Sequence, residues 1–174
     1  MLSDPNFDRT VIFVCFHDAQ GAFGVVLNRP VEAQAADLVP GWDELISPPG
    51  VLHAGGPVER SSFLGLGYMP NAEGDSDWWT GLGRRAVHGL GLVNLAGEPE
   101  QARGLQQLRI FHGYAGWSAN QLDVEIGEDA WWVVDALLED VFASSPVRLW
   151  NTVLQRQRGE LAMYGRYPED PVVN

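Results

Sequence analysis

The stretch from Phe111 to Ile126 constrains the fold most strongly, because it joins a strand signal directly to a helix signal. The apolar run Leu108 to Phe111 leads into it and is typical of a buried strand. Gly113 and Gly116 supply backbone freedom for a change of direction, and Gly127 suits the left-handed position at a helix C-terminus. The pattern therefore predicts a strand, a tight aromatic turn and a helix that ends near Gly127.

Four residues predict where that helix begins. Ser118 and Gln121 have the spacing of a capping box, in which each side chain bonds a backbone N–H group at the helix start. Trp117 and Leu122 flank the cap and have the spacing of a hydrophobic staple. We therefore expect Ser118 to be the N-cap residue and the indole of Trp117 to pack on Leu122.

Three ordered blocks of residues carry a resemblance to a known family. The first block runs from Asp4-Pro5-Asn6-Phe7 through Cys15-Phe16-His17-Asp18, Gly21-Ala22 and Gly24 to Asn28-Arg29-Pro30. The second is Gly55-Gly56-Pro57-Val58, and the third is Gly113-Tyr114-Ala115-Gly116-Trp117 followed by Gln121-Leu122 and Glu125-Ile126. Together they resemble the signature of the AlgH/YqgE family of small bacterial proteins, over most of the chain up to about Trp150.

The resemblance implies an α+β fold, in which a branched, strongly bent mixed sheet curls towards a pseudo-barrel and is flanked by helices. The family is uncharacterised and carries a transcriptional-regulator label without an established activity. The resemblance therefore implies no particular reaction, and we expect no cofactor.

The length and composition predict one globular domain. A chain of 174 residues is long enough for a single core, and we expect one domain over residues 1–174 with an extended tail from about residue 160. No apolar run approaches the roughly 20 residues that a membrane helix needs. Asp4, Pro5 and Asp8 interrupt the N-terminus where a signal peptide would be apolar. These features predict a cytoplasmic protein that does not interact with a membrane.

The acidic charge balance bears on the regulator label. The formal net charge is −12, from 23 acidic and 11 basic residues. Proteins that bind nucleic acid normally place basic side chains against the phosphates. The local pairs Arg84-Arg85 and Arg156/Arg158 are too sparse to form such a surface. Direct nucleic-acid binding is therefore disfavoured, and the expected partner is an unknown protein or a small ligand.

Three further segments have clear strand patterns. Val11 to Phe16 and Ala22 to Leu27 are apolar and flank the turn residues 18–21, which predicts a β-hairpin. Ala130 to Val134 is also strand-like, and Trp131 and Trp132 would then present one large ring to each face.

A small serine hydrolase is the sharpest catalytic alternative. Residues 116–120 read Gly-Trp-Ser-Ala-Asn, which resembles the G-x-S-x-G nucleophile elbow and lies between a predicted strand and a predicted helix. His17, His53 or His112 would then act as the base. We favour the simpler interpretation that Ser118 is a helix cap, and a histidine within reach of the Ser118 Oγ would argue against it.

Cys15 is the other candidate nucleophile and a possible redox thiol. Cys15 and His17 lie two residues apart on a predicted strand, so they would share one face. A neighbouring imidazolium would lower the pKa of the thiol and make it reactive. We favour a buried structural role, because Cys15 lies inside an apolar strand. One cysteine and four histidines without metal-binding spacing predict no metal site.

A pocket for a small ligand or an anion is the site that we expect instead. Gly55 and Gly56 would present backbone N–H groups beside the charge of Arg29, with Tyr114 and Trp117 as aromatic walls. The residues expected at this junction are Asn28, Arg29, Gly55, Gly56, Pro57, Tyr114, Trp117, Gln121 and Glu125. Seven tryptophans also offer material for an aromatic protein-binding surface. Three classes therefore remain open: a non-enzymatic regulatory or interaction domain, a small-ligand binder and a small hydrolase.

Overall fold

The computed structural model describes residues 6–83 and 87–166. Asp4-Pro5 of the first family block, the Arg84-Arg85 pair and residues 167–174 of the expected tail lie outside the described residues. Within the described part of the chain, no helix is long and apolar enough to cross a membrane.

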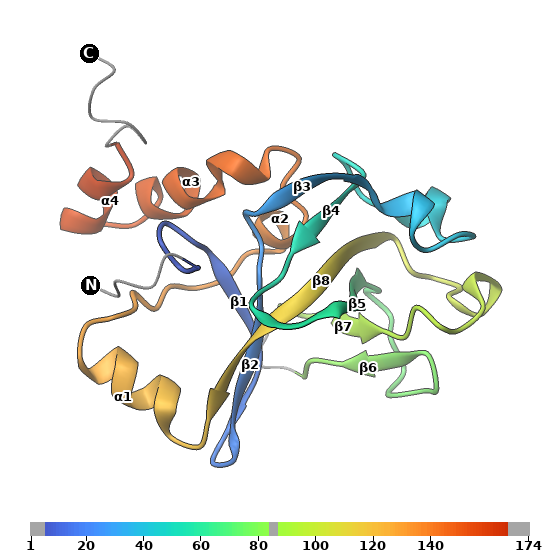
Figure 1. Ribbon diagram of the computed structural model, residues 1–174, viewed down its shortest axis with the longest axis horizontal. Helices are drawn as coiled ribbons and strands as arrows, with labels where there is room; N and C mark the ends of the chain where they lie inside the picture. The colour runs from blue at the N-terminus through green and yellow to red at the C-terminus, as the bar shows by residue number, and fades with distance from the viewer. Residues whose placement is uncertain (1–5, 84–86, 167–174) are drawn as a thin grey trace.

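The secondary structure combines one sheet with short helices (Figure 1). The strands are β1 (Ile12–Asp18), β2 (Gly21–Val26), β3 (Pro30–Gln34), β4 (Val51–Ala54), β5 (Val58–Tyr68), β6 (Trp79–Gly81), β7 (Leu90–Val93) and β8 (Gln107–Ser118). The α-helices are α1 (Gln121–Gly127), α2 (Leu138–Val141), α3 (Leu149–Gln155) and α4 (Glu160–Tyr164).

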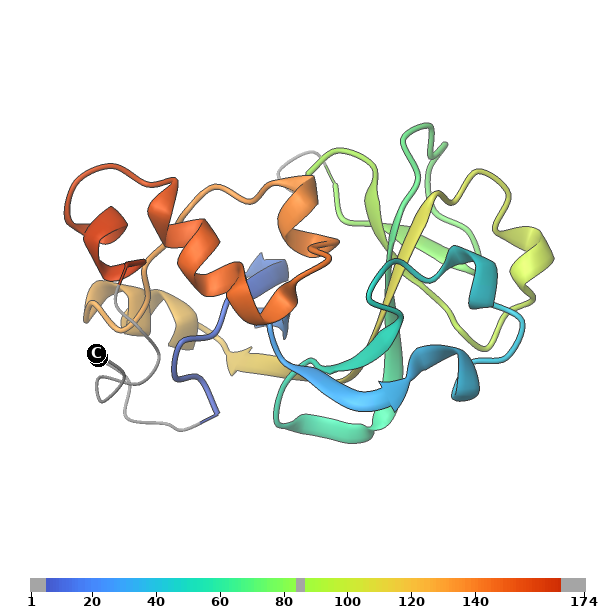
Figure 2. The same cartoon turned by 90° about the horizontal axis from the view of Figure 1, so that it is seen from above.

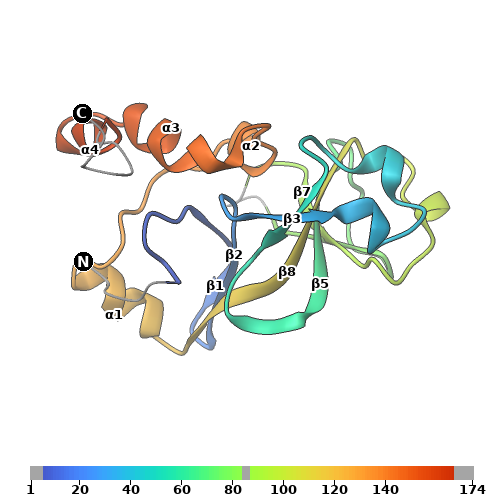
Figure 3. The ribbon, with the colours of Figure 1, turned by 45° about the horizontal axis from the view of Figure 1, so that its top comes forward.

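The sheet branches at β8. Its main path has the strand order β1-β2-β8-β5-β7-β6, and β4 attaches β3 to β8 as a side branch. The pairs along the main path are antiparallel, whereas β4 runs parallel to β8. Figure 3 shows the two branches bending away from each other along β8. Helices α1, α3 and α4 lie beside the β1 and β2 end of the sheet (Figures 1 and 2). The expected α+β fold with a branched, strongly bent mixed sheet is confirmed.

The aromatic motif belongs to β8 and does not form the expected tight turn. The strand continues through residues 113–117 to Ser118. Gly113 has a φ of 64° and lies against the carbonyl oxygens of Gly56 and Val58, which would be 2.6 and 2.7 Å from a Cβ atom at this position. Gly113 therefore allows another backbone to approach a continuous strand, a role that glycine fills because it has no side chain.

The predicted start of the helix is only half right. The helix α1 begins at Gln121 after Asn120, whose φ is 59°, so Ser118 is not the N-cap residue. The backbone N–H of Ser118 donates to the Gln121 Oε1 at 3.0 Å, as in a capping box, but the Ser118 hydroxyl donates to the same oxygen. Trp117 and Leu122 do pack in one buried cluster, and α1 ends at Gly127 as predicted. Gly127 does not take the expected left-handed conformation, which Asp129 adopts two residues later with a φ of 56°.

The apolar run of β8 is buried on both faces. Leu108 and Ile110 belong to a core cluster that includes Trp42, whereas Phe111 belongs to a cluster that includes Val25 and the α2 residue Val141. Alternate residues of a strand point to opposite faces, so one run serves both clusters. This arrangement places α2 and α3 against the face of the sheet that β1 and β2 share with β8.

The hairpin of β1 and β2 forms as predicted, but two other expectations are wrong. Residues 130–134 lie outside the helices and strands, because they connect α1 to α2 without a neighbouring strand to pair with. Residues 160–164 form α4 where the extended tail was expected to begin. Contacts with α3 support this short helix, since Asn151 Nδ2 and Gln155 Nε2 both donate to the Gly165 carbonyl that follows it.

A buried arginine ties the sheet to two loops, which the sequence did not reveal. Arg109 of β8 is 1% exposed, and its Nη2 donates to the carbonyl oxygens of Pro48 at 2.6 Å and Ala143 at 3.0 Å. Burial lowers the pKa of Arg109 to about 10. The Arg109 cation also repels a proton on the fully buried His53 of β4. Burial and the Arg109 cation lower the pKa of His53 to about 4.

The low pKa of His53 makes the stability of the fold depend on pH. The unfolded chain binds a proton at His53 below about pH 6.5, whereas the folded chain does so only near pH 4. Stability is therefore fully present above pH 6.5 and is lost as the pH falls from 6.5 towards 4. We predict that the free energy of unfolding, measured by urea denaturation, decreases by about 2–3 kcal/mol between about pH 7.5 and pH 4.5.

The matched comparison uses His53→Gln, which should remove most of this decrease, and His88→Gln, an exposed histidine whose loss should leave it intact. An unchanged pH dependence in His53→Gln would show that His53 is not the titrating group.

Candidate functional site

The family block at Gly55-Gly56 meets β8 through its backbone, and the block at Arg29 meets the end of β4. The Ala54 N–H donates to the Arg29 carbonyl at 2.8 Å, and the Gly55 N–H donates to the His112 carbonyl at 2.9 Å. A Cβ atom at Gly56 would lie 2.2 Å from the carbonyl carbon of Tyr114. The two glycines therefore permit a close crossing of two chains, and the Gly55 amide is used within the fold.

The side chains of this junction hold the N-terminal segment. Asn28 is buried, its Oδ1 accepts from the Val11 N–H and its Nδ2 donates to the Arg9 carbonyl, both at 2.8 Å. The Arg29 Nη2 donates to the Asp8 carbonyl at 2.5 Å. These bonds fix the chain that precedes β1.

The two remaining members of the junction flank the same crossing. Tyr114 packs edge-on against Phe23 with ring centroids 5.9 Å apart, and Pro57 is exposed. Whether a ligand binds at this junction stays a prediction.

The other expected residues gather around the carboxylate of Glu125. Its Oε2 accepts hydrogen bonds from the indole nitrogens of Trp117 at 2.9 Å and Trp131 at 2.7 Å, and its Oε1 accepts from the Gln121 Nε2 at 2.9 Å. Burial acts to raise the pKa of Glu125, but the hydrogen bonds from Trp131, Gln121 and Trp117 outweigh it and lower the pKa. Glu125 therefore stays ionised and orients two indole rings.

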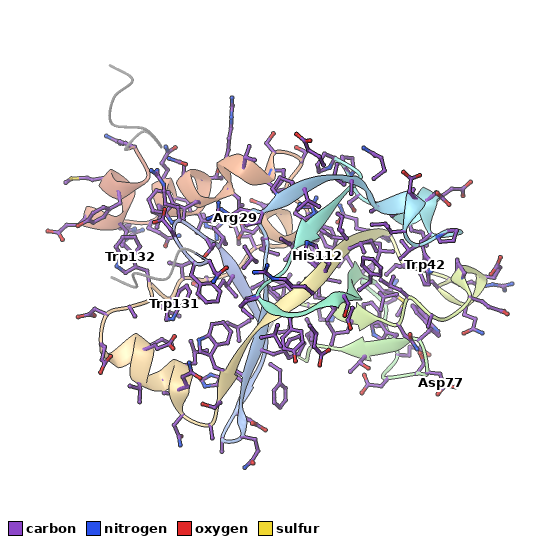
Figure 4. All side chains as sticks on the ribbon, viewed as in Figure 1. Arg29, Trp42, Asp77, His112, Trp131 and Trp132 are labelled. Carbon is purple, nitrogen blue, oxygen red and sulfur yellow. The ribbon has the colours of Figure 1, made fainter. Side chains whose placement is uncertain are left out.

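The expected site residues thus fall into two groups. One group surrounds the crossing of Gly55-Gly56 with β8, and the other surrounds Glu125 at α1. Figure 4 shows Arg29 near the start of β3, while Trp131 and Trp132 lie on the segment after α1. Trp117, a member of the second group, also lines a groove beside β1.

The contacts of Ser118 do not support the hydrolase alternative. Its hydroxyl donates to the Gln121 Oε1, and within the described chain no hydrogen bond joins it to a histidine. The His17 Nε2 lies 3.1 Å from the Asp123 Oδ2, and His53 is buried beneath the sheet surface with its Nδ1 3.1 Å from the Val51 carbonyl. His112 uses its backbone to pair β8 with Gly55. No candidate base is thus bonded to the serine.

Cys15 has the environment of a structural cysteine. It is buried, its Sγ lies 3.7 Å from the Phe13 carbonyl oxygen, and burial raises the pKa of the thiol to about 12. A bulge in β1 between Val14 and Phe16 interrupts the alternation of side chains, so Cys15 faces the core while His17 is exposed. The expectation that they share one face is therefore wrong, and the thiol remains protonated at neutral pH.

Side chains of the types that bind metal ions do not cluster within the described ranges. Within them, no group of three or more His, Cys, Asp or Glu side chains is arranged to hold a metal ion.

A large groove lies between β1, residues 129–136 and the helices α1, α3 and α4. Its volume is about 940 Å³. Its walls are predominantly aromatic and aliphatic, and the aromatic members are Phe7, Phe13, Trp117, Trp131, Trp132, Trp150 and Tyr164. Glu125 stands behind two of these rings, so its hydrogen bonds set the orientation of one wall.

The rings of the groove contact one another in two places. Phe7 packs against Trp117 and Trp131, with centroid separations of 6.5 and 5.5 Å. The ring centroids of Trp132, in the connecting segment of residues 129–136, and Tyr164 of α4 lie 5.0 Å apart. The guanidinium of Arg9 lies 4.2 Å from the centroid of Trp150, within range of a cation–π interaction.

Sequence reasoning found Trp117 but missed the rest of this groove. The sequence pattern predicts a strand at the Trp131-Trp132 doublet, and it gives Phe7 no role beyond membership of a family block. The one available signal was the Trp131-Trp132 doublet itself, two large apolar side chains that follow the acidic residues Glu128 and Asp129. The assembly of the groove depends on chain folding over long sequence separations.

The fold and groove define a class of protein: an α+β domain with a branched half-barrel sheet and an aromatic groove, without a recognisable catalytic centre among its described residues. The AlgH-like family model matches residues 1–162 of the chain. The protein therefore belongs to the AlgH-like family.

Relatives and solved structures agree with this assignment. A UPF0301 protein of Streptomyces avermitilis is 50% identical over 175 residues, which cover 99% of this chain and 90% of the relative. A UPF0301 protein of Thermobifida fusca is 42% identical over 179 residues, covering 100% of this chain and 90% of the relative.

Two solved structures share the fold. The crystal structure of a Corynebacterium diphtheriae protein has a TM-score of 0.83 and 32% identity, covering 95% of this chain and 86% of that one. The solution structure of the AlgH protein from Pseudomonas aeruginosa has a TM-score of 0.67 and 26% identity, covering 97% and 89%. The family is uncharacterised, so these relatives indicate no enzymatic function.

We predict that Glu125→Ala destabilises the protein by about 1–3 kcal/mol, because it leaves two partly buried indole N–H groups without their acceptor. Urea denaturation followed by far-UV circular dichroism measures the change. Glu128→Ala is the matched control, since Glu128 is an exposed carboxylate at the end of the same helix. Equal midpoints for the two variants would contradict the role of Glu125 as the common acceptor.

Proposed function

We propose that this protein is a non-enzymatic binding module and that the groove between β1 and residues 129–136 is its binding surface. The observation that carries the proposal is the aromatic groove itself, whose volume of about 940 Å³ lies near the upper end of known ligand sites. Trp132 and Val133 are 42% and 73% exposed beside it. A bound molecule would cover this apolar surface, which is otherwise in contact with water.

The chemistry of the walls favours binding over catalysis. The Ser118 hydroxyl is engaged by Gln121, and the thiol of Cys15 is buried against the Phe13 carbonyl. The rings of Trp117 and Trp131 are held by Glu125, so part of the surface is organised before a ligand arrives. Preorganised aromatic walls reduce the entropy that binding costs.

A regulatory role is compatible with this surface. The transcriptional-regulator label of the family would then act through a bound ligand or protein, because a net charge of −12 opposes direct contact with nucleic-acid phosphates. A cytoplasmic location, expected from the sequence, remains part of the proposal.

The proposal is tested with Nile red, a neutral dye whose emission shifts to shorter wavelength in an apolar site. We expect the dye to bind the wild-type protein, and Trp132→Ala to weaken binding about tenfold by removing one exposed aromatic wall. Because Trp132 is only partly buried, the thermal midpoint of this variant should change little.

Phe16→Ala is the matched control. Phe16 is an aromatic residue of β1 that is 52% exposed but does not line the groove. Its removal should leave dye binding unchanged. Absence of dye binding to the wild type, or an equal loss in both variants, would contradict the groove as a binding surface.

A further inference from the structure

The outer side of β1 is an open strand edge. Within the described ranges, β1 pairs with β2 alone and ends the strand order. The Val26 N–H donates to the Gly55 carbonyl at 2.8 Å, away from β1, so Ile12 opposite Val26 occupies a pair without hydrogen bonds. Val14, opposite Gly24, repeats this orientation two residues later. The N–H and C=O groups of Ile12 and Val14 therefore point away from β2.

The groove lies along this edge. Thr10 to Val14 form one of its walls, and residues 129–136 form another. The segment 131–136 is also poor in backbone pairing. Among the described residues, its backbone takes part in one hydrogen bond, from the Arg156 Nη2 to the Asp135 carbonyl at 2.8 Å. Two stretches of backbone with unused donors and acceptors thus border the same groove.

The side chains along the groove add apolar and negative surface. Val14 is 39% exposed on the open strand and lines the groove together with the exposed residues Trp132 and Val133. Three carboxylates, those of Asp8, Asp129 and Asp135, belong to exposed residues in the lining. The lining contains one arginine, Arg9, which rests on the Trp150 ring. Arg29 and Arg156 lie outside the lining and donate to the backbone carbonyls of Asp8 and Asp135, and the charge of Arg156 is paired with Asp140. Three carboxylates against one arginine leave the lining negative, which is complementary to a basic partner.

We infer that the groove receives an extended segment of a partner protein, which adds a strand to the open edge of β1 and carries alternating apolar and basic side chains. Main-chain hydrogen bonds to Ile12 and Val14 supply the pairing, and side-chain pockets supply the selectivity, as in other strand-addition complexes. Apolar side chains of the segment contact Trp132 and Val14, and basic side chains face the carboxylates. This inference rests on the proposed function, because it names the class of molecule that the same groove binds.

The probe is a fluorescein-labelled peptide of about eight residues with alternating valine and lysine, long enough to span β1. Fluorescence anisotropy measures its binding to the full chain at low salt. We expect the valine–lysine peptide to bind at least about tenfold more tightly than a valine–glutamate peptide of equal length. A valine–lysine peptide with N-methylated alternate amides should lose binding by about tenfold or more, since it keeps the side chains but lacks the backbone donors.

Variants of Val14 test the strand edge from the protein side. Val14→Pro removes an outward-facing N–H without removing a bond to β2, and proline is tolerated on edge strands in this orientation. It should weaken the peptide about tenfold, whereas Val14→Thr, which keeps the N–H and the branched side chain, should bind within about twofold of the wild type. If Val14→Pro does not fold, the N-methylated peptide on the wild-type protein carries the same test.

The outcomes separate the two proposals. Equal binding of the N-methylated and unmodified peptides, or of the valine–glutamate and valine–lysine peptides, would overturn strand addition by a basic segment. If the wild type then still binds Nile red and Trp132→Ala binds it about tenfold more weakly, the groove is a small-ligand site and the proposed function survives. If neither the dye nor the peptide binds, the proposed function fails as well.

Discussion

The structure depends on the pairing of one strand with three others. The strand β8 is hydrogen-bonded to β2, β4 and β5, so both branches of the sheet are held through it. Glycines at Gly55, Gly56 and Gly113 let the branch after β4 cross β8 at backbone contact distance. A side chain at these positions would meet backbone atoms, which cannot move aside as flexible side chains can. The bend of the sheet follows from this crossing, and it directs β1 and α1 to the same end of the molecule.

At that end, one carboxylate organises the walls of the groove. Glu125 receives indole N–H groups from Trp117 on β8 and from Trp131 on the connecting segment, so it joins two parts of the chain that share no strand pairing. The hydrogen bonds lower the pKa of Glu125 against the opposing effect of burial. The same interaction therefore stabilises the fold and orients rings that face the groove, which connects the structural and the functional interpretation of this region.

The sequence predicted local features well and long-range arrangements poorly. The β1–β2 hairpin, the end of α1 at Gly127 and the packing of Trp117 on Leu122 depend on neighbouring residues, and the structure agrees with each. The family resemblance supplied the branched fold. The groove was missed because its walls come from opposite ends of the chain, and the bulge that separates Cys15 from His17 has no local signal. Buried Arg109 was missed for the same reason, since its partners are carbonyl groups of distant loops.

Amide hydrogen exchange measured by nuclear magnetic resonance tests most directly whether the outer edge of β1 is open. We expect the amides of Ile12 and Val14 to exchange roughly 100-fold faster than that of Phe13, which faces β2 in the same strand. Equal protection of all three amides in the isolated protein would mean that the edge is already paired, and strand addition at β1 would then be excluded.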